Sequence, residues 1–213
     1  MLSEIEKERL RRFGEVGAII TDSHIVYTSG KHGSAYVNKD AIYPHTHLTC
    51  DLCKDIATAF AKDNVEVVLA PEKGGIILSQ WVAYWLQLNN ISSPEILSAY
   101  AEKDDDGFVL KRGYGKIVSG KRVLVVEDLL NTGGSAFKTV ELARSVDANV
   151  IGVGALCNRG NVTARHLGDV PKLFSLVNVS MEAFNADSCP LCRTGVPINT
   201  TVGHGKQFLA ERV

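Results

Sequence analysis

The residues best suited to chemistry lie together in the segment VLVVEDLLNTGGS, between positions 123 and 135. Four apolar residues lead into two adjacent acids, Glu127 and Asp128, and a loop of small residues follows. Glycines let backbone N–H groups approach a phosphate closely, and the N-terminus of a following helix adds partial positive charge. The hydroxyls of Thr132 and Ser135 are further donors to the same anion. The segment therefore predicts a phosphate-binding loop.

The acid pair requires a different partner, because carboxylates repel a phosphate. Vicinal hydroxyls and a magnesium ion both suit Glu127 and Asp128. A ligand that carries ribose hydroxyls beside a phosphate satisfies both halves of the segment. The structural alternative is an Asp-rich turn that caps a Rossmann-like helix.

The elements around this segment are typical of an α/β protein. Repeated strand–loop–helix units imply a parallel sheet with helices on both faces, and ligands bind outside the carboxyl ends of such strands. Strands are expected at 24–27, 35–37, 65–70, 95–100, 122–126 and 150–157, and helices at 3–13, 46–62, 76–88 and 135–146. Loops leave the carboxyl ends at 71–75, 127–135 and 158–161.

The segment 123–135 resembles the 5-phosphoribosyl-1-pyrophosphate (PRPP) signature of the type I phosphoribosyltransferases: an apolar strand, two acids, an apolar pair, then small-Thr-Gly-x-Ser. The stretch YTSGKHGSAYV at 27–37 is similar to the element that covers the base in the orotate phosphoribosyltransferases. The loop APEKGGI at 70–76 falls where that family has its pyrophosphate loop, and Arg159 falls where it has an arginine for the orotate carboxylate. The resemblance runs from about Gly17 to Arg159.

The resemblance implies a type I phosphoribosyltransferase fold, a parallel sheet flanked by helices, in a single domain over 1–213. A small hood would consist mainly of 1–45 and the C-terminal tail, and a flexible lid would lie at about 101–120. It also implies a homodimer and Mg²⁺ bound through PRPP.

The activity implied is that of a pentosyltransferase: the 5-phosphoribosyl group of PRPP passes to orotate, giving orotidine 5′-phosphate and pyrophosphate in pyrimidine biosynthesis. The alternatives are a phosphoribosyltransferase for another base, such as a purine, and a non-catalytic PRPP-sensing regulator. The catalytic residues would be Glu127, Asp128, Lys111 and Arg112. The PRPP-binding residues would be Lys73, Gly74, Glu127, Asp128, Leu129, Leu130, Asn131, Thr132, Gly133, Gly134 and Ser135. The base-binding residues would be Lys31, Tyr36, Val37, Asn131 and Arg159.

The sequence departs from the family pattern mainly in the lid. The family's Arg-Lys pair falls near Tyr100 and Ala101, and its catalytic Lys-x-His falls on Asp104 and Asp106. The lysine before Ser-Gly in the base-covering element is Thr28 here. Cations occur later, so we expect the returning half of the lid to supply charge. These cations are Lys111, Arg112 and Lys116. The alternative for this charged stretch is a solvated β-hairpin.

The cysteines form two Cys-x-x-Cys pairs and one single residue. The pair Cys50 and Cys53 lies within a predicted helix, where thiols at this spacing usually pack. The pair Cys189 and Cys192 lies in a proline-containing turn, with His204 twelve residues further on. This setting resembles a zinc knuckle and makes Cys189 and Cys192 candidate zinc ligands, although the sequence does not assure four ligands.

The composition limits the partners of the protein. The 213 residues carry 23 Lys and Arg against 24 Asp and Glu, a net charge of −1, so a nucleic-acid partner is disfavoured. The most apolar stretch, at 76–88, is shorter than the roughly 20 residues that a bilayer requires, so no membrane partner is expected. The charged N-terminus lacks the apolar core of a secretion signal, so we expect a cytoplasmic protein whose partners are PRPP and a nucleobase.

Overall fold

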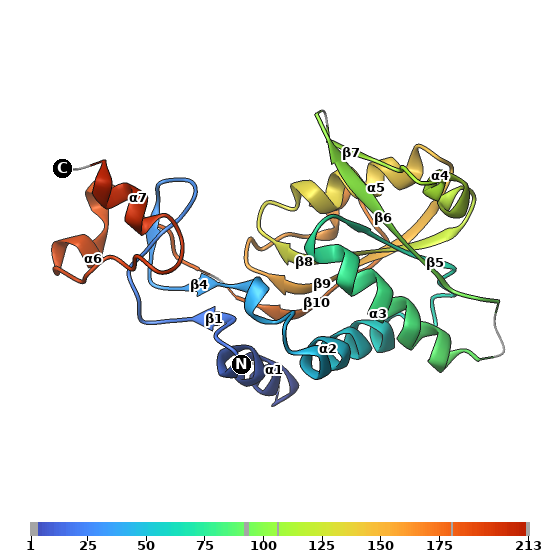
Figure 1. The fold of residues 1–213 in the computed structure, drawn as a ribbon, viewed down its shortest axis with the longest axis horizontal. Helices are drawn as coiled ribbons and strands as arrows, with labels where there is room; N and C mark the ends of the chain where they lie inside the picture. Colours follow the sequence, from blue (N-terminus) through green and yellow to red (C-terminus); the bar gives the residue numbers. More distant parts are fainter. Residues whose placement is uncertain (1–3, 92–93, 106, 180, 212–213) are drawn as a thin grey trace. The chain divides into compact units, whose positions relative to one another are not determined.

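The computed structural model describes residues 4–91, 94–105, 107–179 and 181–211. The chain divides into two compact units, which we describe separately (Figure 1). Unit 1 consists of Met1–Pro44 and Ser180–Val213, and unit 2 of His45–Val179. Unit 1 takes in nearly the same residues as the hood expected from the sequence. Its action as a hood stays a prediction, as does the assignment of 1–213 to one domain.

Unit 2 is built on a six-stranded sheet with the order β10-β9-β8-β5-β6-β7. Its strands run parallel, apart from β7, which pairs antiparallel with β6. The α/β fold class with a parallel sheet is therefore confirmed. The strands are β5 (Val67–Pro71), β6 (Leu97–Asp104), β7 (Gly107–Val109), β8 (Arg122–Leu130), β9 (Asn149–Asn158) and β10 (Leu173–Asn178).

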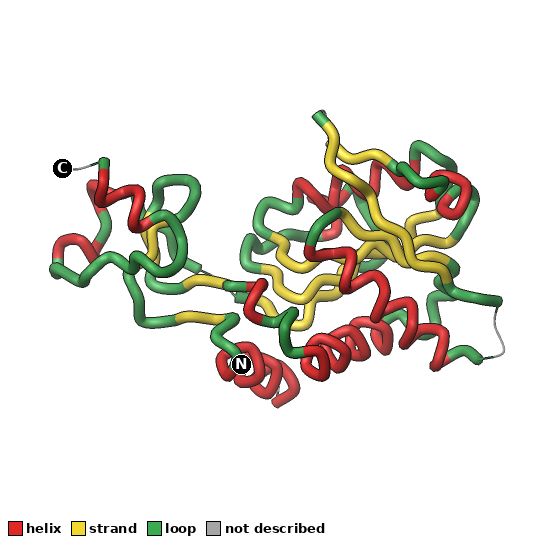
Figure 2. Tube along the Cα trace, viewed as in Figure 1, coloured by secondary structure: helices red, strands yellow, loops and turns green. Residues whose placement is uncertain are grey.

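Helices cover both faces of this sheet, with α2 and α3 on one side and α4 and α5 on the other (Figures 1 and 2). The central strand β8 is buried on both faces, as its continuous apolar run predicts: all four side chains from Val123 to Val126 are fully buried. Gly154 of β9 permits close packing, since a Cβ there would lie 2.7 Å from Cγ2 of Ile56 on α2. The helices are α2 (Thr46–Ala59), α3 (Gly74–Asn89), α4 (Tyr114–Val118) and α5 (Gly134–Arg144), with a short 3₁₀ helix, η2 (Ala164–Leu167).

The main departures of the sheet from the sequence-based strands concern β8, β6 and β10. Strand β8 continues through both acids to Leu130, because β9 offers a continuous ladder as far as Asn158. Strand β6 likewise continues to Asp104, because its outer half pairs with β7 in an edge hairpin where charged side chains reach solvent. Strand β10 was not expected: it is a short run that pairs with β9 alone at the sheet edge, and half of its residues are partly exposed.

Unit 1 joins both ends of the chain through small elements. Strands β1 and β4 pair antiparallel, as do β2 and β3, each with two residues. Strand β3 was expected as part of a loop. The elements are α1 (Glu4–Glu15), β1 (Ile19–Ile20), β2 (Ile25–Val26), β3 (His32–Gly33), β4 (Tyr36–Val37), η1 (Lys39–Ala41), η3 (Ala186–Ser188), α6 (Pro190–Arg193) and α7 (Gly205–Ala210).

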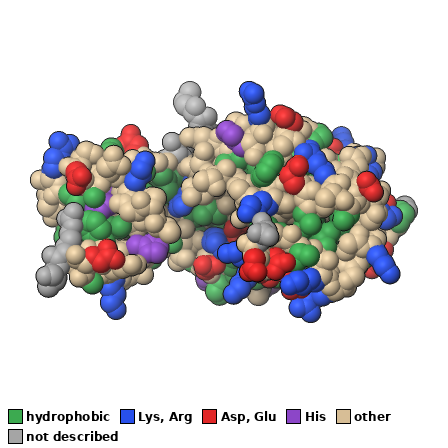
Figure 3. Space-filling model, turned by 90° about the horizontal axis from the view of Figure 1, so that it is seen from above, with side chains coloured by type: hydrophobic (Ala, Val, Ile, Leu, Met, Phe, Trp, Pro, Cys, Tyr) green, Lys and Arg blue, Asp and Glu red, His purple; other side chains and the backbone are tan. Residues whose placement is uncertain are grey.

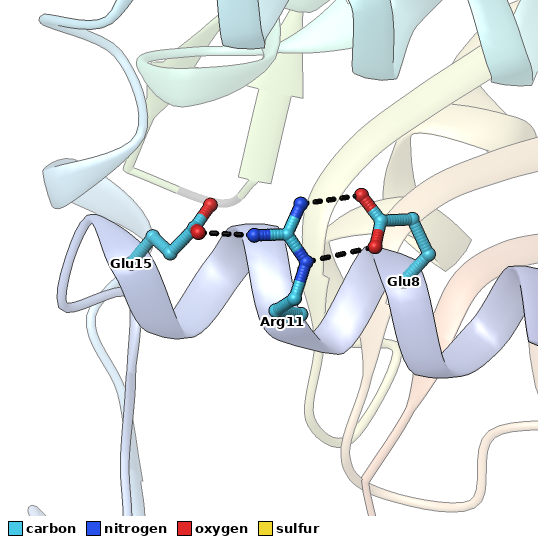
Figure 4. Close-up of polar contacts among 3 residues, drawn as sticks. All are labelled: Glu8, Arg11 and Glu15. Carbon is cyan, nitrogen blue, oxygen red and sulfur yellow. Dashed lines mark hydrogen bonds and ion pairs between the residues drawn. The ribbon is translucent and has the colours of Figure 1, made fainter.

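Helix α1 is amphipathic, as its sequence predicts, with Phe13 buried and charged residues exposed. Ser3, where the helix was expected to begin, lies outside the described residues. On the exposed side, the Arg11 guanidinium donates two hydrogen bonds to Glu8, at 2.8 and 2.6 Å, and also contacts Glu15 (Figure 4). These bonds lower the pKa of Glu8, because they favour its ionised form. One arginine thus links three turns of the helix surface.

The surface mixes charges of both signs. Lys, Arg, Asp and Glu side chains are interspersed on the face seen in Figure 3. None of the helices in the described part of the chain is both long enough and apolar enough to span a membrane.

Candidate phosphoribosyl-transfer site

The acid pair lies close to the carboxyl end of β8. Glu127 and Asp128 are nearly buried, at 7% and 6% exposure. The Asp128 backbone N–H donates to Oε1 of Glu127 at 3.0 Å, which orients the Glu127 carboxylate. Both acids lie on β8, where Glu127 pairs with Ala155 of β9, and such a rigid support positions functional groups more precisely than a loop does.

The loop after β8 leads directly into helix α5. Gly133 has a φ of +81°, and a Cβ there would lie 3.0 Å from Val162, so the turn favours glycine. The Thr132 hydroxyl accepts a hydrogen bond from the Gly134 N–H at 3.3 Å. Thr132, Gly134 and Ser135 are exposed at the N-terminus of this 11-residue helix. Hydroxyls, a glycine backbone and a helix N-terminus together form the arrangement that suits an anion.

The loop after β9 packs on the loop after β8. The backbone N–H groups of Arg159 and Gly160 donate to the Leu130 carbonyl at 2.9 and 3.1 Å. A Cβ on Gly160 would overlap the Asn131 carbonyl at 1.4 Å, so a side chain there would force the loops apart. Nε of Arg159 donates to Oδ1 of Asn131 at 3.3 Å. The structure therefore brings together Asn131 and Arg159, the two expected base-binding residues of unit 2.

Leu129 and Leu130 differ in their exposure. Leu129 is partly exposed, whereas the Leu130 side chain is 1% exposed and belongs to the core under α5. Since the Leu130 carbonyl also accepts two loop N–H groups, we expect this residue to shape the loop rather than to contact PRPP through its side chain.

The loop after β5 reaches the same edge of the sheet, because β5 lies beside β8 and runs parallel to it. The Glu72 N–H donates to the Ala101 carbonyl at 2.9 Å, and the Lys103 N–H donates to the Glu72 carboxylate at 2.8 Å. Lys73 is exposed just before α3, with Gly74 at the first helical position. The peptide bond between Glu72 and Lys73 is cis. Lys73 thus ends a loop that is held by strand β6, and Gly74 begins α3 directly after it.

The expected lid has the form of the β6–β7 hairpin followed by the short helix α4. Lys111, Arg112 and Lys116 are all exposed. The Arg112 guanidinium donates to the Glu102 carboxylate at 2.7 Å, and this carboxylate raises the pKa of Arg112. Asp106 lies outside the described residues. The hairpin that we weighed as an alternative is present, and its role as a flexible lid stays a prediction.

The remaining base-binding candidates belong to unit 1. Lys31 is exposed in the turn between β2 and β3, and Tyr36 is half-buried. The Val37 side chain is 3% exposed, within strand β4. A role for these three residues at the base stays a prediction.

The cysteine pair in unit 1 lies beside two histidines that sequence reasoning missed. Cys189 and Cys192 lie with His24 and His32, not with His204. Nε2 of His204 instead lies 3.1 Å from the Thr28 hydroxyl, so His204 as the companion of the cysteines is wrong. His24 and His32 precede the cysteines by more than 150 residues, so only the fold reveals them.

The other three cysteines lie in unit 2 and differ in environment. Burial raises the pKa of the Cys157 thiol to about 12, and it also raises the pKa of the Cys53 thiol. Cys53 lies on helix α2 together with Cys50, as the sequence predicts. Raised pKa values keep Cys53 and Cys157 protonated near neutral pH, which is typical of thiols that pack.

Comparison with known protein families identifies the family of this chain. A family model described as the phosphoribosyl transferase domain matches residues 45–191. The chain belongs to the phosphoribosyltransferase family.

Individual phosphoribosyltransferases resemble the chain over nearly its full length. An orotate phosphoribosyltransferase of Desulforamulus reducens is 35% identical over 185 residues, which cover 87% of this chain and 90% of that protein. Another, from Caldanaerobacter subterraneus, is 32% identical over 194 residues, which cover 91% of this chain and 96% of that protein. The resemblance to orotate phosphoribosyltransferases stated from the sequence is confirmed.

Solved phosphoribosyltransferase structures share the fold. The Mycobacterium tuberculosis orotate phosphoribosyltransferase in complex with PRPP aligns with a TM-score of 0.59 at 18% identity, over 82% of this chain and 96% of that one. An adenine phosphoribosyltransferase from Thermoanaerobacter pseudethanolicus aligns with a TM-score of 0.60 at 19% identity, over 79% of this chain and 99% of that one. Since enzymes for two bases align about equally well, the fold does not select the base.

Proposed function

We propose that this protein transfers the 5-phosphoribosyl group of PRPP to orotate, which yields orotidine 5′-phosphate and pyrophosphate. The observation that carries the proposal is the edge formed by β8 and α5, where an acid pair adjoins a glycine loop at a helix N-terminus. The choice of orotate rests on the similar relatives, which are named for that base.

The reaction replaces one bond to the ribose C1 carbon with another. The bond to pyrophosphate breaks, N1 of orotate bonds to C1, and the N1 proton is released. Positive charge develops on the ribose ring and negative charge on the leaving group, so positioning and electrostatics supply the rate without a protein nucleophile.

The residues of the site suit these changes in charge. Asn131 to Ser135 would hold the 5′-phosphate through hydroxyls and backbone N–H groups. Glu127 and Asp128 would hold the ribose hydroxyls and stabilise the ring as it becomes positive. Lys73, Lys111 and Arg112 would attract the pyrophosphate.

A magnesium ion fits the donor types at this edge, since Mg²⁺ prefers oxygen ligands and the two acids supply carboxylates. Its contribution when bound with PRPP would be to neutralise charge on the leaving pyrophosphate. We also expect the protein to act in the cytoplasm and as a homodimer.

A release assay tests the proposal. Purified protein with PRPP and Mg²⁺ should release pyrophosphate when orotate is added, and much more slowly with adenine, hypoxanthine or uracil. Preference for a purine would refute the choice of orotate while leaving phosphoribosyl transfer in place.

A non-catalytic PRPP sensor is the second candidate, because the described lid residue Asp104 is an acid where the family has a catalytic cation. A sensor would bind PRPP in calorimetry and release no pyrophosphate with any base. Turnover of any base at about 1 s⁻¹ or faster excludes it.

A further inference from the structure

Four potential metal-binding side chains meet inside unit 1: His24, His32, Cys189 and Cys192. Their ligand atoms all lie within 4.8 Å of one another. Nε2 of His24 lies 2.9 Å from Nδ1 of His32 and 3.7 Å from Sγ of Cys189. Sγ of Cys192 lies 3.3 Å from Nδ1 of His32 and 3.6 Å from Nε2 of His24. Two nitrogens and two sulfurs thus face a common centre.

These separations are close to those of a tetrahedral zinc site. Zinc binds imidazole nitrogen at about 2.0–2.1 Å and thiolate sulfur at about 2.3 Å. Tetrahedral angles then place neighbouring ligand atoms about 3.3 to 3.8 Å apart. Three of the six pairwise separations fall in this range, and the histidine pair, at 2.9 Å, would need to open by about half an ångström. The remaining two, from Cys189 to Cys192 and to His32, lie within 4.8 Å.

A hydrogen bond outside the cluster orients one ligand. The Nδ1 of His24 lies 2.7 Å from the Val196 carbonyl oxygen. Because a carbonyl only accepts, Nδ1 must carry the proton, and the lone pair of the ring lies on Nε2, which faces the cluster. Metal-ligating histidines usually have such a partner on the second nitrogen, which fixes the tautomer.

The cluster is built into the backbone of unit 1 from both ends of the chain. His24 and His32 are 1% and 0% exposed, and Cys189 is 0% exposed. The Asn199 N–H donates to the His24 carbonyl at 2.8 Å, and His32 and Phe184 exchange two backbone hydrogen bonds of 2.8 Å. The N-terminal histidines are thereby held in register with the C-terminal segment that carries both cysteines.

We propose that His24, His32, Cys189 and Cys192 bind one structural zinc ion. Two thiolates and two imidazoles form a soft donor set that suits zinc and not magnesium, so this site is separate from any magnesium bound with PRPP. All four positions are filled by protein side chains, as in structural rather than catalytic zinc sites.

The zinc would stabilise a unit with a modest core. Among the described residues, few large apolar side chains of unit 1 are fully buried, notably Phe13, Ile25 and Ile42. Small units of this kind often depend on a metal or a disulfide. The ion would also fix the β2–β3 hairpin that contains the turn 27–31, since His24 directly precedes β2 and His32 begins β3. This turn belongs to the element expected to cover the base.

Metal analysis of the full-length protein tests the proposal. Protein purified without chelator should contain about one zinc per chain, because structural zinc binds too tightly to be lost on dilution. Cys192→Ser and His24→Ala should each retain less than about a tenth of that amount. Cys50→Ser, which alters the other Cys-x-x-Cys pair, and His204→Ala, which alters a nearby histidine, should retain it fully.

Two measurements on the native chain keep the test independent of how the variants fold. Cobalt added to chelator-treated protein should give the visible absorption of tetrahedral thiolate coordination. Zinc, but not magnesium, should restore the melting temperature that the chelator lowers. The proposal fails if the native protein contains no zinc or contains iron in its place. It also fails if a thiol count finds three of the five cysteines free, which would indicate a Cys189–Cys192 disulfide.

Discussion

At the scale of single residues, the site depends on groups that the sheet and its loops hold in fixed positions. Asp128 sits on a central strand, and Arg159 is held by two backbone bonds between neighbouring loops and by the Asn131 side chain. Charges fixed in this way need no reorganisation during a reaction, so we expect the removal of either one to affect the rate more than the fold.

Asp128→Asn tests the role of the acid pair. The neutral amide keeps the shape of the side chain but cannot stabilise a ribose ring that becomes positive. We expect kcat/KM to fall at least ~10-fold, or ~1.4 kcal/mol, with an unchanged melting temperature. Steady-state kinetics measure the effect. Asp147→Asn changes an exposed acid beyond the far end of α5 and serves as the control. Full activity in Asp128→Asn would refute the assignment.

Arg159→Ala tests the recognition of the base. A guanidinium paired with the orotate carboxylate is worth roughly 1.5–3 kcal/mol, which corresponds to about a 10- to 150-fold loss in orotate use. The affinity for PRPP should stay nearly unchanged. The kcat/KM for uracil, which lacks the carboxylate, should fall little. Kinetics with both bases measure this. Arg165→Ala removes an exposed arginine of η2 as a matched control. Equal use of orotate by variant and native protein would exclude the carboxylate contact.

At the scale of elements, two strand–loop–helix units, β5 with α3 and β8 with α5, present their loops at one edge of the sheet. Gly75 lets α3 approach β5 closely, since a Cβ there would lie 2.7 Å from Cβ of Ala70. The hairpin of β6 and β7 extends from the same sheet, and its neighbouring loop carries exposed cations. The edge of the sheet therefore presents two loops held by strands and helices, with a cationic segment beside them.

Replacing Lys111, Arg112 and Lys116 together by alanine tests that cationic segment. If these side chains act on the leaving pyrophosphate, kcat should fall at least ~10-fold while PRPP still binds in calorimetry. Lys62→Ala, which removes an exposed lysine beyond α2, should change neither value. An unchanged kcat in the triple variant would show that the segment is a solvated hairpin without a catalytic role.

At the scale of the whole molecule, helix α3 presents apolar side chains to solvent. Ile77, Tyr84 and Leu88 are 40%, 49% and 42% exposed, and their spacing places them on one side of the helix. Exposed apolar residues grouped in this way are typical of interaction surfaces. Together with the homodimer that the family resemblance implies, they suggest that a second copy of the chain covers this face.

The dimer prediction is tested by light scattering after size exclusion. The native chain of 23.1 kDa should elute with about twice that mass. Tyr84→Glu should give monomers, because a buried unpaired charge is costly at an interface. Asn89→Asp adds a charge to the same helix away from the apolar face and should remain dimeric. A monomeric native protein would rule the dimer out.

The local chemistry was predictable from the sequence because it depends on neighbours in the chain. The apolar run before Glu127 predicts a buried strand, and the glycines after Asn131 predict the turn into α5. Strand bounds were less predictable: the two acids suggest an end to β8, but hydrogen bonding with β9 continues the strand to Leu130. Pairing between strands is a non-local interaction that local composition does not encode.

The histidine–cysteine cluster was decided by the tertiary structure alone. Sequence proximity favoured His204 as the companion of Cys189 and Cys192, yet His204 lies against Thr28. The fold of unit 1 instead brings His24 and His32 to the cysteines by pairing segments from opposite ends of the chain. A continuous segment determines its own loop and helix, whereas ligands separated by more than 150 residues meet only through backbone pairing between distant segments.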